Sequence, residues 1–151
     1  EETAIFNGME DGGIEGICEA AANKPVTLTS DPDAYQSAIE DAVLALQKSG
    51  IEGPYALVLD TQAYKMLMAG DSRGYPLIKR VEDMVGGGIH WSPAISGGCL
   101  MSTRGGDFEL TVGQDASVGY KGADTKEVAL FLTESFTFLV LEPAAAVELK
   151  W

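Results

Sequence analysis

The sequence predicts an α+β fold in which helices come first and antiparallel strands follow. From residue 32 to residue 85, apolar residues recur mostly at three- and four-residue spacing, which is the period of an amphipathic helix. After the glycine triplet at residues 86–88, apolar and polar residues alternate and β-branched and aromatic types become frequent. That second pattern is typical of strands, so the chain divides into a helical first part and a β-rich second part.

The first segment, residues 1–20, predicts a helix end that runs into a looped connection. Glycines at positions 8, 12, 13 and 16 separate isolated apolar residues, which is unfavourable for any regular element. Ile5 and Phe6 are apolar and require a partner surface.

The clearest predicted helix begins near residue 32. Ser30 or Asp31 can cap it, Pro32 suits its first turn, and Gly50 stands where a C-cap is expected. One apolar face joins Ala34, Tyr35, Ala38, Ile39, Ala42, Val43 and Leu46.

Three further elements follow before the glycine triplet. Gly53 and Pro54 break the chain, and residues 55–59 read as a short buried strand. Asp60 or Thr61 can cap a second helix that ends near Met68. Residues 69–74 are polar and glycine-rich, so an exposed loop is expected there. A third helix is expected over residues 77–85.

The second part predicts strands at residues 89–91, 99–103, 108–112 and 127–141, with a short strand or turn at 144–151. Residues 104–107 predict the turn of a hairpin that joins 99–103 to 108–112. Arg104 and Asp107 form either a local ion pair there or, if the tip inserts into a neighbouring subunit, a pair that fixes register. Residues 113–120 predict an exposed bend, which is either a tight loop or a groove for an extended peptide that contacts Val118 and Tyr120.

Composition limits the function classes. The 151 residues are enough for one domain with a core, and the net charge of −13 disfavours binding to nucleic acid. The acidity favours solubility, or alternatively an acidic pore or lumen that attracts cations. No apolar run is long enough to span a bilayer, and no signal peptide is visible. Cys18 and Cys99 form no CxxC pattern, so two buried thiols in a reducing cytosol are expected, with a disulfide left open.

No catalytic or cofactor motif is found. The glycines at 86–88 follow a helix and precede a strand, which favours a C-cap and turn over a phosphate loop. His90 is the sole histidine and no GxSxG elbow is present, so a structural role is favoured over a hydrolase. Asp31 and Asp33 are explained by helix capping. We therefore expect no enzyme activity, no metal and no cofactor.

Several long motifs resemble one family. These are AIFNG at residues 4–8, GIEGI at 13–17, GIEGPYALVL at 50–59, GYPLIKRVEDMVGGGIHWSP at 74–93, STRGGDFELTVGQDASVGY at 102–120 and LFLTESFTFLVLEP at 130–143. On these residues the chain resembles the encapsulins, the bacterial and archaeal nanocompartment shell proteins once called linocin or maritimacin. The resemblance covers essentially every residue present.

The resemblance implies the tailed-phage major-capsid fold, made mainly of the A-domain and part of the P-domain. Residues 1–24 would end the P-domain spine and connect it, 25–106 would form the A-domain, 107–139 P-domain strands, and 140–151 a return to the A-domain. Family members carry an N-terminal helix, an E-loop and most of a spine helix before these residues, so the chain resembles the C-terminal portion only.

The resemblance also implies function. Encapsulins are not enzymes; they self-assemble in the cytoplasm into icosahedral shells around cargo such as ferritin-like proteins, which store iron, or dye-decolourising peroxidases. Cargo binds through its C-terminal targeting peptide, and neither nucleic acid nor membrane is a partner. Asp71, Ser72 and Arg73 would line the fivefold pore. The cargo groove would include Asp115, Ser117, Val118 and Tyr120.

Two alternatives belong to other classes of protein. The first is a peptidase or bacteriocin, activities once attributed to relatives. The second is a freestanding A-domain-like module that forms small rings without closing a shell.

Overall fold

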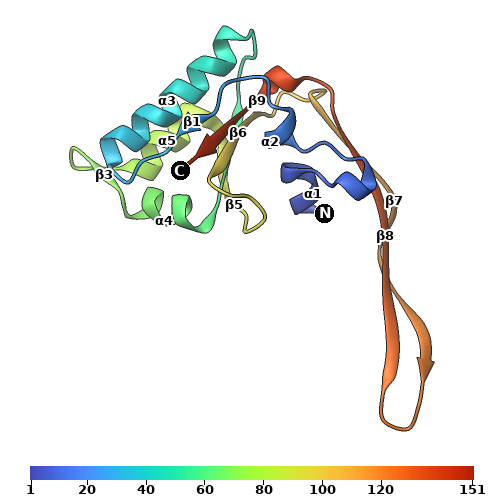
Figure 1. The fold of residues 1–151 in the computed structure, drawn as a ribbon. Helices are drawn as coiled ribbons and strands as arrows, with labels where there is room; N and C mark the ends of the chain where they lie inside the picture. Colours follow the sequence, from blue (N-terminus) through green and yellow to red (C-terminus); the bar gives the residue numbers. More distant parts are fainter.

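The computed structural model describes residues 1–151, apart from the side chain of Ser72. Figure 1 shows a body of helices and short strands and, projecting from it, a long two-stranded ribbon. We use "the body" for residues 1–107 and 141–151, and "the ribbon" for residues 108–140. The predicted α+β architecture is confirmed, with all five α-helices preceding the two longest strands.

The body is built on a five-stranded sheet with the order β1-β9-β6-β2-β5. Its strands are β1 (Val26–Thr27), β2 (Tyr55–Leu59), β5 (Gly86–Trp91), β6 (Gly98–Ser102) and β9 (Ala146–Lys150). β6 is antiparallel to both β2 and β9, whereas β2 runs parallel to β5 and β1 runs parallel to β9. The sheet is therefore mixed, and β6 lies at its centre.

Helices cover one face of this sheet and the N-terminal segment covers the other (Figure 1). On the first face lie α3 (Pro32–Lys48), α4 (Thr61–Ala69) and α5 (Leu77–Val85). On the second lie α1 (Glu2–Asn7) and α2 (Ile17–Ala20), with the 3₁₀ turn η1 (Glu10–Gly12) between them. Because strand side chains alternate, Leu57 and Leu59 enter the first core while Val58 enters the second.

The predicted helix caps are present. The Asp31 carboxylate accepts a hydrogen bond from the Ala34 amide at 2.9 Å, so Asp31 rather than Ser30 caps α3. Asp60 caps α4 in the same way, accepting from the Ala63 amide at 2.7 Å. At the end of α5, Gly86 is left-handed and closes the helix, and β5 begins at once, three residues earlier than predicted.

The predicted exposed loop at residues 69–74 is a small hairpin, β3 (Asp71–Ser72) paired with β4 (Tyr75–Pro76). The predicted terminal strand is also present: η2 (Pro143–Ala145) leads into β9. Both elements lie in the body.

The predicted hairpin between residues 99–103 and 108–112 is wrong. β6 pairs with β2 and β9 in the body, and β7 (Phe108–Ala123) pairs with β8 (Val128–Val140) in the ribbon. Residues 104–107 form the corner between the two sheets. The local pattern predicted strand, turn and strand correctly, but not which strands pair. Cys99 and Leu100 are buried on opposite faces, which suits the central strand of the body sheet.

The predicted bend at residues 113–120 is also wrong, because β7 continues through it. Register shifts lie between Val112 and Gln114, between Gln114 and Ser117, and between Tyr120 and Gly122. Each places an extra residue in β7, so Gly113 marks a bulge rather than a turn, and Gly119 stays in register with Phe131. The turn lies at residues 124–127, where the Asp124 carboxylate accepts hydrogen bonds from the amides of residues 126 and 127.

An ion pair between exposed Arg104 and buried Asp107 holds the corner between body and ribbon. Arg104 donates from Nη2 to Asp107 Oδ1 at 2.7 Å and from Nε to Oδ2 at 3.0 Å. The Asp107 carbonyl accepts from the amides of Leu141 and Glu142, which closes the base of the ribbon. The local ion pair predicted for Arg104 and Asp107 is therefore present.

We expect Asp107→Asn to lower the free energy of unfolding by about 1–3 kcal/mol at neutral pH, the cost of losing charge-assisted hydrogen bonds in a buried place. Hydrogen bonds from Arg104 hold the pKa of Asp107 below its usual value of 3.8. A lowered pKa contributes stability above the ordinary carboxyl pKa, and that stability is lost as the pH falls through the lowered value. Urea unfolding at pH 7 and near pH 3 should therefore show the difference between variant and wild type shrinking in acid.

The matched control for this ion pair is Glu82→Gln. It removes the exposed pair that Lys79 forms with Glu82 at 2.8 Å, and it should change stability very little. If both variants lowered the free energy of unfolding equally, or if the loss in Asp107→Asn did not change with pH, the ion pair would not stabilise the corner as expected.

Candidate functional site

The ribbon carries most of the large apolar side chains that the described part of the chain leaves exposed. Two strands alone are marginally stable in water, and each apolar side chain covered by protein stabilises by about 1.5–3 kcal/mol. Figure 1 shows the outer part of the ribbon standing clear of the body. An exposed apolar surface of this extent is typical of an interaction site.

The strand register places seven of these nine side chains on one face, while Phe131 and Leu139 project from the other. Val118 pairs directly with Leu132 and Tyr120 with Leu130, and residues in direct register project to the same side of a sheet. All the extra residues lie in β7, so β8 alternates without interruption. The "apolar face" of the ribbon consists of Leu110, Val112, Val118, Tyr120, Val128, Leu130 and Leu132.

At its base the apolar face is already covered. Phe138, which pairs with Leu110, is only 5% exposed and packs in the second core with Ala4 and Ile17. Phe108 and Val140 pack against the same core. The apolar face therefore continues the core of the body outward, and only its inner end has a cover in the described residues.

Two of the predicted cargo-groove residues lie on the apolar face. Val118 is 65% exposed and Tyr120 is 66% exposed. Leu130 and Leu132 flank them across the ribbon, and neither was singled out from the sequence. Apolar residues at every second position of β8 are a sequence signal for Leu130 and Leu132. That signal identifies a shared face with Val118 and Tyr120 only once the pairing of β8 with β7 is known.

The other two predicted residues lie in the bulged part of β7. Asp115 accepts a hydrogen bond from the amide of Ala116 at 2.8 Å. Ser117 accepts from Nε2 of Gln114 at 2.8 Å and donates to the Thr133 carbonyl at 3.5 Å. The four predicted residues thus follow one strand, but Ser117 is in register with Thr133 and projects to the face opposite Val118 and Tyr120.

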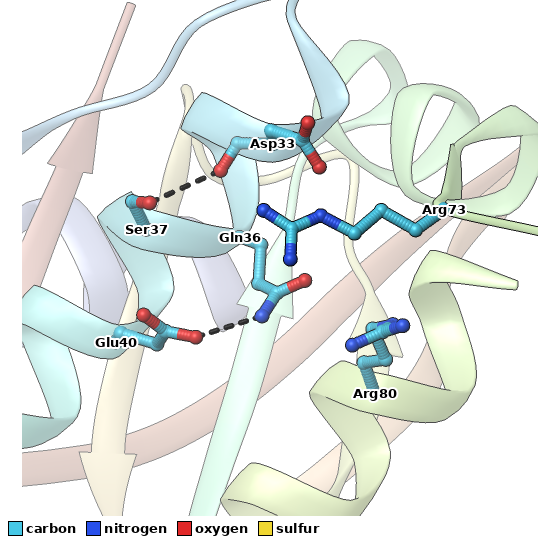
Figure 2. Close-up of a pocket in the computed structure, with 6 residues that line it drawn as sticks. All are labelled: Asp33, Gln36, Ser37, Glu40, Arg73 and Arg80. Atoms are coloured by element: carbon cyan, nitrogen blue, oxygen red, sulfur yellow. Dashed lines mark hydrogen bonds between the residues drawn. The ribbon is translucent and has the colours of Figure 1, made fainter. Parts of the chain in front are cut away.

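The β3–β4 tip carries the three residues predicted to line a pore. The Asp71 carboxylate accepts from the Gly74 amide at 2.7 Å and so fixes the tip itself. The side chain of Ser72 lies outside the described residues. Arg73 has a left-handed backbone, with φ 54°, and its guanidinium reaches back between Asp33 and Gln36 of α3 (Figure 2).

Arg73 closes one side of a small polar pocket of about 210 Å³. Inside it, Gln36 donates to Glu40 at 2.7 Å. Figure 2 shows the two arginines entering from the tip and from α5. The lining residues are Asp33, Gln36, Ser37, Glu40, Arg73 and Arg80. With two carboxylates and two guanidinium groups, the pocket is close to neutral and presents little net charge.

The catalytic alternative gains no support from the geometry around His90. His90 is exposed on β5, an edge strand of the sheet. The hydroxyl of Ser92 donates to Glu2 at 2.7 Å rather than to the imidazole. Among the described residues, no group of three or more histidine, cysteine, aspartate or glutamate side chains could hold a metal ion.

None of the helices that the structure describes combines the length and the apolar character that crossing a bilayer requires.

Comparison with known proteins gives a consistent result. A family model described as "Encapsulating protein for peroxidase" matches residues 1–137. A type 1 encapsulin shell protein of Rhodospirillum rubrum is 43% identical over 151 residues, covering 99% of this chain and 54% of the relative. One of Mycolicibacterium paratuberculosis is 40% identical over 149 residues, covering 99% of this chain and 56% of the relative. The chain thus spans about half the length of these relatives.

Solved structures show the same likeness at the level of fold. A virus-like particle from Pyrococcus furiosus superimposes with a TM-score of 0.71 at 21% identity, covering 83% of this chain and 54% of that one. A structure from Mycobacterium phage Che8 gives a TM-score of 0.58 at 15% identity, covering 83% and 53%.

Proposed function

The chain belongs to the encapsulin shell-protein family, and from that premise we propose that it is part of a structural subunit that self-assembles into a closed icosahedral compartment around cargo enzymes. The α+β fold is that of the virus-like particle and phage relatives. The observation that carries the proposal is the uncovered apolar face of the ribbon. The inner end of this face is buried in the second core. Its outer part has the same apolar character, so we infer that further polypeptide buries it.

The proposed division of the chain follows body and ribbon. Residues 25–106 and 140–151 form the A-domain, and residues 107–139 form P-domain strands. Residues 1–24 connect the two, which agrees with their packing against both the body sheet and the base of the ribbon. The corner at Arg104 and Asp107 then marks the passage from one domain to the other.

We assign two roles along the apolar face. Its inner part, at Leu110 and Val112, packs against further polypeptide of the shell. Its outer end, at Val118 and Tyr120, receives the extended C-terminal targeting peptide of the cargo, with Asp115 and Ser117 beside it. Both strands of the ribbon have open edges, which favours peptide binding by strand addition as well as by side-chain contact.

The remaining parts of the proposal rest on the family. The β3–β4 tip, with Asp71, Ser72 and Arg73, surrounds the fivefold pore. The printed description of the family model points to a peroxidase as cargo; a ferritin-like protein is the other cargo class. The shell resides in the cytoplasm.

Co-expression tests assembly and cargo binding together. The full protein that contains this chain is produced with a fluorescent protein carrying a cargo C-terminal peptide, then separated by size-exclusion chromatography and viewed by negative-stain microscopy. We expect closed particles that co-elute with fluorescence. Small rings would favour the A-domain-like module instead, and a monomer would overturn the shell function.

Paired variants locate the cargo site in the same experiment. Tyr120→Asp should leave particles intact and remove the fluorescence, because a carboxylate at this position is costly to bury under an apolar peptide. Thr137→Asp places the same charge on the opposite face of the ribbon, at an exposed residue that pairs with Thr111, and should retain cargo. Loss of fluorescence in both variants, or in neither, would contradict the assigned site.

A further inference from the structure

Two thiols from distant parts of the chain lie against each other in the second core. Cys99 is in β6 at the centre of the sheet and has no exposed surface. Cys18 is in α2 and packs against the cluster that contains Cys99. The side chains of Cys18 and Cys99 interact there, and both cysteines are free.

The two thiols differ in access to solvent. Cys18 is half-buried and opens onto a cavity of about 380 Å³ between α1, α2 and β9. The cavity is lined by Asn7, Cys18, Glu19, Glu148 and Lys150. A small oxidant can therefore reach Cys18, whereas Cys99 is reached only through Cys18. An accessible thiol beside a buried second thiol is the arrangement of a reactive cysteine and its resolving partner.

The surroundings favour Cys18 as the reacting thiol. The hydrogen bond from Cys99 lowers the pKa of Cys18, and the Lys150 ammonium acts in the same direction, against burial and the Glu148 carboxylate. Lys150 and Glu148 are paired at 3.0 Å, so their charges largely offset each other at the cavity. The same thiol–thiol hydrogen bond, together with burial, raises the pKa of Cys99 well above its usual value. Cys18 also borders the cavity whereas Cys99 is fully buried, so the nucleophilic sulfur is that of Cys18.

We propose that Cys18 and Cys99 form a peroxide-sensitive pair that closes a disulfide between α2 and β6. The Cys18 thiolate attacks one oxygen of hydrogen peroxide and the O–O bond breaks, giving Cys18 sulfenic acid and hydroxide, which takes up a proton to become water. The sulfur of Cys99 then attacks the Cys18 sulfur. An S–S bond forms, the S–O bond breaks, and the leaving hydroxide takes the Cys99 proton to form a second water. Two thiols are oxidised and one peroxide is reduced.

This oxidation is independent of shell formation and is tested on the full protein, assembled or not. The protein is treated with hydrogen peroxide, alkylated without reduction, digested and examined by mass spectrometry. We expect a peptide pair that joins Cys18 to Cys99, lost alkylation at both residues, and recovery of both by dithiothreitol.

Variants separate the steps. Cys99→Ser should leave sulfenic acid at Cys18, which dimedone traps, while Cys18→Ser should leave Cys99 reduced under the same treatment. Cys99→Ala replaces Cys99→Ser if circular dichroism shows that the serine variant is unfolded, because alanine introduces no buried hydroxyl. Irreversible oxidation of Cys18 in the wild type without the cross-linked peptide, or no change at either thiol, would overturn the proposal.

Discussion

Leu110→Glu or Val112→Glu should abolish shell assembly while the subunit itself stays folded. Both side chains are about half exposed in the chain alone, at 46% and 47%, so a glutamate is tolerated there as long as water reaches it. Covering the same position with apolar polypeptide would bury an unpaired charge at a cost of several kcal/mol per subunit. Size-exclusion chromatography and microscopy should show soluble, unassembled protein with a helix and strand content equal to that of the wild type.

Thr111→Glu is the matched control for these two variants. Thr111 lies between them on the same strand, projects to the opposite side, and contacts Glu109 there at 3.4 Å. It adds the same charge and should leave assembly intact. If Thr111→Glu blocked assembly as strongly, or if Leu110→Glu and Val112→Glu assembled normally, the apolar face would not be the packing surface.

Gly97→Ala should give the largest loss of stability in the body, about 3–5 kcal/mol. Gly97 has φ +74°, and a Cβ there would overlap the backbone carbonyl of Leu149 in β9. The backbone cannot move aside, since the Gly97 amide donates to Asp60 at 2.7 Å and its carbonyl accepts from the Asp60 amide at 2.9 Å. Urea unfolding should show a lowered midpoint, and β9 should lose protection from hydrogen exchange.

Gly105→Ala separates the two causes of the stability loss, which are backbone strain at a positive φ and overlap of the new Cβ with β9. Gly105 also has a left-handed backbone, with φ +88°, but a Cβ there would meet no atom within 4 Å. This variant should cost only the backbone strain, about 1–2 kcal/mol. Equal losses at the two positions would mean that close contact with β9 contributes nothing.

The sequence predicted the elements whose signals are local. The helix at residues 32–48 was predicted because a cap, a proline in the first turn and a regular apolar stripe agree with one another. The strand at 55–59 was predicted because five buried residues stand between a chain break and a cap. Pairing is not local, so the partner of residues 98–102 was missed and a hairpin was predicted instead.

The candidate site shows the same limit. Val118 and Tyr120 were predicted as part of an exposed peptide groove and from the family resemblance, but Leu130 and Leu132 join them only through the register of β7 with β8. Bulges hid that register, because glycines within a strand resemble turn signals. The contact between Cys18 and Cys99 could not be predicted either, since nothing in the spacing of two cysteines on different elements indicates proximity.

The topology also sets an order of events during folding. β7 and β8 are joined by a four-residue turn, so the ribbon forms by local contacts and can close quickly. The body sheet instead needs β9, which follows the ribbon in the chain and fits between β1 and β6. Until β9 has been synthesised, β6 lacks one neighbour and the first core lacks Val147 and Leu149. A nascent chain therefore exposes the apolar face of the ribbon before the body has folded. Between the synthesis of the ribbon and that of β9, the chain is most prone to premature association.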